Sequence, residues 1–523
     1  MLLKLNSELF RDIWMHTELQ TISAKAEGQA AATPAENTGE APHVYTKFSR
    51  PHEVVLVFCL MFAQLITQAG VAQGLLPLTY IGDSFGVTSV STLSWSVAGY
   101  SLTVGTFILC AGRLGDIFGH KKMFLFGFLW IVVWTLLTGL SSYSNFIFFC
   151  ICRGFQGVGA AFLLPNAMAI IGRSYPPGTK QTMVFSLFGA CAPSGFGLGA
   201  VFSSLLAQKA SWEWTFYLGA VVSAAVGVLS FFVVPSDEGS EQRAESFDYW
   251  GAVLGISGLI LVNVAWNQGP NVGWTAPYTY VLLILGALLL AAFLFAELKV
   301  AHPLISLSLF NKKTGLALTC IACGWGTFGI WIFYLFQMLL VLREDTPLLT
   351  TAQFSPAIIS GFIASGVTGF LLSRRVPVGV VMIFAMSAFL ASSLLLATMP
   401  VNQTYWAQTF VSFVIAPFGM DMSFPAATIM FSTAVPRKYQ GMAASLVSTV
   451  VNYSISIALG MAGTVVAYTS PGQSEPELTT AVHYAAYLAV GLSGLGVFCS
   501  VVATFVEISE RTRGNNMETP VRA

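Results

Sequence analysis

Fourteen apolar runs, each long enough to cross a bilayer, fill most of this 523-residue chain. Crossing the roughly 30 Å hydrocarbon layer takes about 20 residues as a helix, because lipid offers no partner to an open backbone donor or acceptor. We therefore predict an all-α integral membrane protein with fourteen transmembrane helices. The runs lie at about 54–76, 90–111, 123–141, 145–172, 182–207, 213–234, 250–267, 278–296, 314–341, 351–372, 376–398, 405–431, 440–468 and 482–506.

The composition excludes several classes of function. Hydrophobic residues make up 55% of the chain and charged residues 9%, whereas an average soluble protein is about a quarter charged. A net charge of zero gives no reason to expect a nucleic acid partner. The sequence has no GxxxxGK[ST] phosphate loop, and its spans hold no paired acids and no metal-ligand cluster. We expect no enzyme, no cofactor and no metal, and we interpret the eight cysteines as small buried hydrophobes without a disulfide framework.

The basic residues predict the topology, because Lys and Arg in short loops stay on the cytoplasmic side. With the first 53 residues inside, an even number of spans places both termini in the cytoplasm, and only Lys209 and Arg343 fall outside. We interpret residues 1–53 as a disordered tail, 236–249 as an acidic cytoplasmic linker and 507–523 as a second tail. We favour the plasma membrane over the vacuolar membrane, and a monomer.

Polar landmarks recur at a spacing near 260 residues. Pro165 finds Pro425 at an offset of 260, and Pro177 and Gln181 recur at an offset of 259. This repeat predicts two copies of a six-helix bundle, at 54–235 and 314–506, with a two-helix insert and loop at 250–313 between them. Because six is even, both copies have the same orientation. Parallel repeats of this kind hold a small solute between two bundles that rock about it.

The segment GRLGDIFGHKK, between the second and third spans, is the predicted gate. We expect a loop whose glycines permit tight turns and whose charges pin one helix end against another in one state. For the two lysines, a plain positive-inside anchor is an equal alternative. The candidate gating residues are Gly112, Arg113, Gly115, Asp116, Gly119, Lys121 and Lys122.

Two charged residues lie within spans and carry the predicted chemistry. A central cation such as Arg153 costs about 2.5–3.5 kcal/mol on insertion scales, which favours contact with a cavity or a partner; snorkelling to the interface is the alternative. Arg stays protonated, so Asp421, the one carboxylate we place deep in the membrane, is the predicted proton-linked or substrate-linked acid. A fixed ion pair or a structural acid is the alternative for Asp421. Gln68 and Gln156 complete the coupling or substrate set.

The fifth span and several isolated polar side chains are further candidates. Gly189, Pro193, Gly195 and Gly199 predict a kinked helix that can pack closely on a neighbour and slide. Six polar side chains could line a cavity, and each could equally form an interhelical hydrogen bond. These are Gln64, Asn166, Asn263, Tyr334, Gln337 and Asn452.

These motifs resemble a known family. GRLGDIFGHKK, RGFQGVGAAFLLPNA and the proline-glycine span are similar to the major facilitator superfamily over residues 54–506, and fourteen spans match its drug:proton antiporter branch. LITQAGVAQGLLPLTYIGDSFG resembles the fungal subgroup of aminotriazole-resistance and boron-efflux transporters. The resemblance implies export of small solutes in exchange for protons, with Arg153 in the coupling role. The sequence departs from the family pattern at two positions. Gln68 stands where the branch usually has an acid, and Ala192 stands where a glycine usually precedes the proline of the fifth span.

We therefore favour a secondary transporter that exports a small toxic compound or metabolite against protons, as multidrug-resistance proteins do. One alternative is a facilitator or importer of a small inorganic or nitrogenous solute such as borate or ammonium. A second is a transporter-like nutrient sensor. The partners that these hypotheses require are a small-molecule solute, protons and the lipid bilayer.

Overall fold

The computed structural model describes residues 48–176, 178–236, 247–300, 303–305, 310–435, 440–469 and 475–518. Within these ranges, fourteen helices are long and apolar enough to cross a membrane and no strand forms, which confirms the predicted all-α class. A short helix, α3 (Leu78–Phe85), follows the first of them. The spanning elements are α2 (Arg50–Gln73), α4 with α5 (Val90–Leu93, Trp95–Phe118), α6 (His120–Leu140), α7 (Phe146–Ser174), α8 (Thr179–Lys209), α9 (Glu213–Val233), α10 (Tyr249–Val272), α11 (Pro277–Glu297), α12 (Lys312–Gln337), α13 (Pro347–Ser373), α14 (Val378–Ala397), α15 (Gln408–Thr433), α16 (Gln440–Thr469) and α17 (Glu475–Glu518).

Local chemistry sets the ends of several of these helices. The side chain of Asn145 accepts a hydrogen bond from the backbone N–H of Phe148 at 2.9 Å and so begins α7. A capping box in which Asn311 and Thr314 bond reciprocally begins α12. Gly119, with φ of 98°, is the single residue between α5 and α6, because this left-handed conformation suits a residue without a Cβ.

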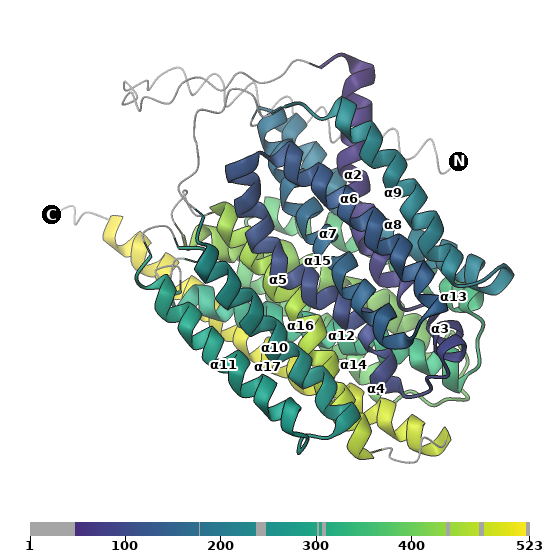
Figure 1. The fold of residues 1–523 in the computed structure, drawn as a ribbon. Coiled ribbons are helices and arrows are strands. Elements are labelled where there is room, and N and C mark those ends of the chain that lie inside the picture. Colours follow the sequence, from purple (N-terminus) through teal and green to yellow (C-terminus); the bar gives the residue numbers. More distant parts are fainter. Residues whose placement is uncertain are drawn as a thin grey trace, which may run out of the picture. The chain divides into compact units, whose positions relative to one another are not determined.

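The helix pairings repeat between the two halves of the chain. In the first half α2 packs along α8, α5 along α7, and α6 along α7 and α9. In the second half α12 packs along α16, α13 along α15, and α14 along α15 and α17, in the same order. Two six-helix bundles of equal design follow from these pairings. The insert helices α10 and α11 pack on each other, and α10 also packs on α16 and α5 (Figure 1). The domain boundaries stay a prediction.

Two helix pairs join the bundles. Along α5 and α16, the Ser456 hydroxyl donates to the Ala98 carbonyl at 2.8 Å, and a Cβ at Gly105 would lie 2.7 Å from the Tyr453 backbone nitrogen. Along α8 and α13, the Ser204 and Thr351 hydroxyls lie 2.7 Å apart. Both contacts bring small or hydroxyl-bearing residues together, as expected where helices approach closely inside a membrane.

The α8–α13 contact is closed at one end only. We call the end of the bundles where α5 stops and α6 starts the basic end, because Lys121, Lys122 and Lys180 lie there. Towards this end, a Cβ built at Gly189 of α8 or at Gly366 of α13 meets nothing within 4 Å. The contacts between α8 and α13 that carry close packing, Ser204 with Thr351 and Pro193 with Gly361, thus lie from the middle of the pair to the end opposite the basic end, which we predicted to face the cytoplasm.

The structure corrects three expectations about local conformation. GRLGDIFGHKK is not a loop, because α5 continues through Phe118 and α6 starts at His120. The segment holds no proline, so α5 continues as far as Gly119, whose φ of 98° ends it. Helix α2 begins at Arg50 and α17 runs to Glu518, so both predicted tails are partly helical. Residues 1–47 of the first tail and 237–246 of the linker lie outside the described residues.

Candidate functional site

Arg153, on α7, is fully buried and joins three helices of the first bundle. Its Nε donates to the Ser96 carbonyl of α5 at 3.0 Å, and its Nη2 donates to the Gly70 carbonyl of α2 at 2.6 Å. Its Nη1 donates to Oε1 of Gln156, one turn further along α7, at 2.5 Å. A side chain with no exposed surface does not snorkel, so that alternative is wrong. The planar fork of the guanidinium suits acceptors that lie in different directions.

Aromatic and polar groups complete the layer around this guanidinium. The Cζ atom of Arg153 lies 4.8 Å from the ring centroid of Tyr100, within cation–π range, and the Tyr100 hydroxyl donates to the Thr67 carbonyl at 2.8 Å. A Cβ at Gly74 would lie 2.6 Å from Arg153 Nη2, so the guanidinium occupies the space that a side chain would fill. The predicted coupling residue thus serves as a cross-link of α2, α5 and α7.

Asp421, on α15, is half-buried at the contact between the two bundles. Its Oδ2 lies 2.9 Å from the point where a Cβ of Gly361 on α13 would stand, and Pro193 Cβ of α8 lies 3.4 Å from the same point. Within the ranges that the structure describes, no cation and no hydrogen-bond donor contacts the carboxylate. A fixed ion pair with an arginine of these ranges is therefore excluded. The acid lies where α8 of one bundle meets α13 of the other.

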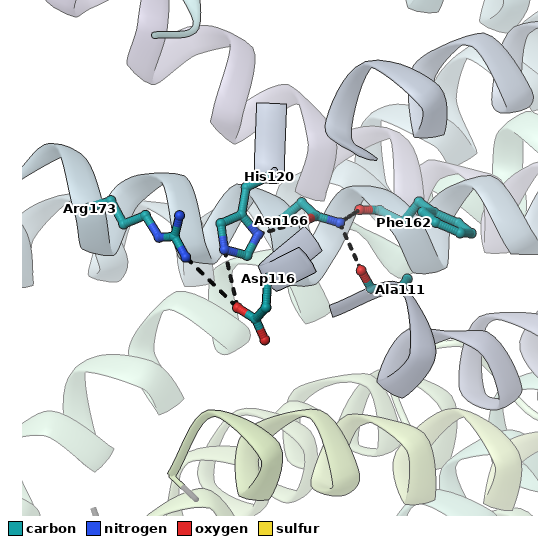
Figure 2. Close-up of polar contacts among 6 residues, drawn as sticks. All are labelled: Ala111, Asp116, His120, Phe162, Asn166 and Arg173. Carbon is teal, nitrogen blue, oxygen red and sulfur yellow. Dashed lines mark hydrogen bonds and ion pairs between the residues drawn. The ribbon is translucent and has the colours of Figure 1, made fainter. Parts of the chain in front are cut away.

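A polar cluster at the basic end joins α5, α6 and α7 (Figure 2). Asp116 Oδ1 lies 3.4 Å from His120 Nε2 and 3.9 Å from Arg173 Nη2. His120 Nδ1 lies 2.8 Å from Asn166 Oδ1, and the Asn166 amide donates to backbone carbonyls of α5 and α7. Asn166, which we predicted among the cavity residues, is engaged here. Our sequence reasoning assigned no role to His120 and Arg173, and helix spacing offered no signal for them because Asp116 and His120 lie on different helices.

The remaining residues of the predicted gate surround this cluster. A Cβ at Gly115 would clash with Asn166 and lie 2.5 Å from His120 Nδ1, so a glycine is needed for α5 and α7 to approach. The Lys121 ammonium lies 5.7 Å from the Phe231 ring of α9. Gly112 has ordinary contacts, the nearest to Pro165 at 3.5 Å, while Arg113 and Lys122 lie on the same two helices. The gating role of these residues stays a prediction.

An exposed ion pair and a buried phenol tie α2 to α8 at the same end. Lys180 Nζ lies 2.6 Å from Glu53 Oε1, and the lysine side chain is 63% exposed. Burial, reinforced by the negative charge of Glu53, raises the pKa of Tyr175 to about 12, so its phenol stays neutral in physiological conditions. Exposed pairs of this kind contribute about 0–1 kcal/mol, and we assign no functional role to this one.

The proline-glycine helix has two different faces. Gly195 and Gly199 face α2, where added Cβ atoms would lie 2.5 Å from the Leu65 carbonyl oxygen and 2.6 Å from Ala69 Cα. Pro193 faces α13 instead, and Gly189 faces open space. Helix α8 runs from Thr179 to Lys209 as one element, and its predicted kink stays a prediction. The face towards α2 is closely packed, so any sliding of α8 would occur on its other face.

The other cavity candidates, and Gln68 of the coupling set, fall into four environments. Tyr334 and Gln337 of α12 are buried, and the Tyr334 hydroxyl and the Gln337 amide oxygen have no hydrogen-bond partner among the described residues. Asn263 Oδ1 of the insert lies 2.8 Å from the Ser456 hydroxyl oxygen, and Asn263 so belongs to the α10–α16 contact. Asn452 donates within its own helix. Gln64 and Gln68 lie half-buried on α2. The unpartnered groups of α12 are the strongest of these candidates for binding a polar solute.

Two equal six-helix bundles, a buried arginine in one of them and a carboxylate at their contact define the class of two-bundle secondary transporters. The chain belongs to the Major Facilitator Superfamily, whose family model matches residues 56–461. The predicted family is therefore confirmed, and its members and relatives are transporters, not enzymes.

Two curated relatives and one solved structure are similar to this chain over most of its length. The chain is 54% identical over 468 residues to a low affinity ammonium transporter of Saccharomyces cerevisiae, which covers 88% of this chain and 90% of that protein. It is 46% identical over 420 residues to the efflux pump terJ of Aspergillus terreus, with 79% and 81% covered. A crystal structure of a POT family transporter in complex with a thioalcohol-conjugated peptide aligns with a TM-score of 0.66 at 14% identity, over 87% of this chain and 97% of that one. At that identity the likeness concerns the fold alone.

Proposed function

We propose that the protein exports a small toxic compound or metabolite in exchange for protons, at the plasma membrane and with both termini in the cytoplasm. The observation that carries this proposal is the position of Asp421 at the α8–α13 contact, without a cation beside it in the described residues. Ionisable side chains are costly inside a membrane and mark proton relays and substrate paths. A carboxylate placed between two moving bundles can hold a proton in one state and release it in the other.

Alternating access supplies the mechanism for this exchange. The Ser204–Thr351 contact closes the end of the α8–α13 pair opposite the basic end, while Gly189 and Gly366, nearer the basic end, have no neighbour within 4 Å of an added Cβ. Rocking the bundles would separate the first contact and bring the second pair together. Asp421 lies between the two, so the same motion would move its access from one side of the membrane to the other. Arg153 cannot release its proton and would keep α2, α5 and α7 moving as one unit.

The direction of transport is supported by the relative named an efflux pump. Solute binding would involve the unpartnered Tyr334 hydroxyl and Gln337 amide oxygen, because a buried polar group left without a partner costs about 1–3 kcal/mol that a bound polar solute could recover.

Ammonium transport is the second candidate, and a specific observation favours it. The relative that is 54% identical is named a low affinity ammonium transporter. A single carboxylate with no paired cation also suits a small cation such as ammonium. Import of ammonium and export of an organic solute differ in direction and in the species that Asp421 would bind. The nutrient-sensor reading stays an untested alternative.

Transport by Asp421→Asn across a range of pH tests the coupling. Proteoliposomes with an imposed pH gradient would report solute flux, with Asp83→Asn, an exposed acid on α3, as the matched control. We expect Asp421→Asn to lose pH-driven flux while Asp83→Asn keeps it. A pH profile identical to that of the wild type in Asp421→Asn would refute the coupling role.

Direction is tested in a pair of strains that lack or overexpress the protein. Export predicts higher tolerance and lower accumulation of a transported compound on overexpression, across a panel of drugs, borate and ammonium. Greater ammonium uptake on overexpression, with no change for the organic compounds, would replace export with the second candidate.

A further inference from the structure

Two buried carboxyl groups meet at the basic end of the helical insert, away from the contact between the bundles. Asp248 caps the first turn of α10, where its Oδ1 accepts from the Gly251 backbone N–H at 2.8 Å. Glu297 is the last residue of α11, and its Oε2 accepts from the Ile305 backbone N–H at 3.2 Å. Asp248 is 8% exposed and Glu297 is 5% exposed. One oxygen of each group is therefore used to hold the local backbone.

The second oxygen of each group has no partner. Asp248 Oδ2 and Glu297 Oε1 are shielded from solvent and accept no hydrogen bond from the residues that the structure describes. Both atoms converge on Gly251, because a Cβ at that residue would clash with Asp248 Oδ2 and lie 3.2 Å from Glu297 Oε1. The missing side chain of Gly251 is what lets the two carboxyl groups approach each other.

The surroundings give these oxygens no charge compensation. Cys110 of α5, Ala252 of α10 and Leu304 form an apolar cluster around the pair, with Phe247 and Phe293 against it. The Cys110 thiol is the titratable group that α5 presents to the pair. Among the residues that the structure describes, no lysine, arginine or histidine faces either carboxyl group.

Two carboxylates cannot both be charged at close range in an apolar site, as shared-proton pairs in other proteins show. Each unpartnered oxygen also leaves a buried acceptor unsatisfied, at about 1–3 kcal/mol. One proton placed between Asp248 Oδ2 and Glu297 Oε1 removes both penalties. A hard cation is the weaker occupant, because Ca²⁺ takes about 6–8 oxygen ligands and the described residues hold no group of three or more candidate ligands.

We propose that Asp248 and Glu297 share a single proton and so form a pH-sensitive clasp. The clasp ties the start of α10 to the end of α11 and, through Ile305, to the segment that leads into α12. Because α10 packs on α16 and α5, the clasp steadies the insert against the helix pair that joins the two bundles. Loss of the proton places two negative charges together and opens the insert at this end. The stabilisation is thus present at low pH and is lost as the pH rises.

Infrared difference spectroscopy of the full-length protein in lipid nanodiscs tests the shared proton. The Asp421→Asn variant serves as the background, so that the proposed coupling acid does not contribute. We expect an acid C=O stretch that remains where exposed carboxyl groups are already ionised and disappears on raising the pH further, and we expect Glu297→Gln and Asp248→Asn to lack this band in that pH range. Glu344→Gln, at an exposed acid, is the control that should keep the band. A band unaffected by both pair variants would overturn the proposal.

Thermal unfolding over the same pH range provides the second measurement. The amide of Glu297→Gln can donate to Asp248 Oδ2 without a titrating proton, so we expect this variant to fold and to lose the fall in Tm that the wild type shows as pH rises. The same slope in both proteins would contradict the clasp. A rise in wild-type Tm on adding Na⁺ or Ca²⁺, absent in Glu297→Gln, would replace the proton by a cation and overturn the proposal as well.

Discussion

The role of the buried Arg153 guanidinium can be tested with Arg153→Lys. This substitution keeps the positive charge and removes the planar group that donates hydrogen bonds in several directions. The guanidinium reaches the carbonyls of Gly70 and Ser96 and the amide of Gln156 in three directions. An ammonium group is a compact point charge on a flexible stem and cannot span the same acceptors. We expect at least two of the three hydrogen bonds to be lost, with the acceptors left buried.

The magnitude follows from the cost of unsatisfied acceptors. Each costs about 1–3 kcal/mol, and we take the lower part of the range for two of them, about 2–4 kcal/mol in total, because helix carbonyls keep their internal bonds. A loss of 1 kcal/mol lowers the Tm of a domain of about 150–250 residues by about 2–4 °C, so the expected fall in Tm is roughly 4–16 °C. Solute flux is expected to fall with it, because α2, α5 and α7 no longer move together.

Thiol-reactive dye unfolding suits this measurement, since seven of the eight cysteines are buried and become reactive only on unfolding. Arg374→Lys, the same change at an exposed site, is the control and should melt with the wild type. Gly74→Ala displaces the Arg153 fork without altering the arginine and is expected to lower Tm in the same direction. A wild-type Tm and wild-type flux in Arg153→Lys would refute the argument, because a positive charge at this position would then be sufficient for stability and transport without the guanidinium hydrogen bonds.

Three further substitutions test the gate, the coupling acid and the solute site. Gly115→Ala places a methyl group against Asn166 and is expected to reduce flux at least severalfold, measured in proteoliposomes. Gly361→Ala places a methyl group 2.9 Å from Asp421 Oδ2 and is expected to shift the pH profile of flux. Tyr334→Phe removes a hydroxyl that has no hydrogen-bond partner, so Tm should hold or rise while the KM for the solute rises.

Each of these predictions has a result that contradicts it. Gly366→Ala, on the same helix as Gly361 but facing open space, is the matched control and should leave the pH profile unchanged. Equal shifts in both alanine variants would remove Asp421 from the explanation. Wild-type flux in Gly115→Ala would mean that the basic-end cluster tolerates displacement, and a fall in Tm without a change in KM in Tyr334→Phe would show a structural hydroxyl.

Hydropathy predicted the number of helices because crossing a bilayer demands a minimum apolar length, and the length of an apolar run can be read directly from the sequence. Hydropathy did not predict where the helices end. The stretch from Gly112 to Phe118 is charged enough to resemble a loop, yet α5 simply continues into water. The repeat was recoverable from Pro165 and Pro425 because these prolines lie within α7 and α15, the helices that correspond in the two bundles.

The site was predictable only in part. Arg153 and Asp421 were identifiable because a charge within a span is costly and therefore has a reason to be there. Their neighbours were not, since backbone carbonyls, a glycine and a proline carry no signature of what lies against them. Asp248 and Glu297 stand at opposite ends of the insert, each at the edge of an apolar run, and only the antiparallel packing of α10 and α11 brings them together.

The single-residue connection at Gly119 has a mechanical consequence. Helices α5 and α6 are rigid rods joined with no slack, so a displacement of the end of α5 cannot be absorbed by the chain and must be passed to α6. Helix α5 packs on α16 of the other bundle, whereas α6 packs on α7 and α9 within its own. Displacement of α5 is therefore passed to α6 through the chain itself, and inserting two or three flexible residues after Gly119 would remove this direct link while keeping the packing of both helices on α7.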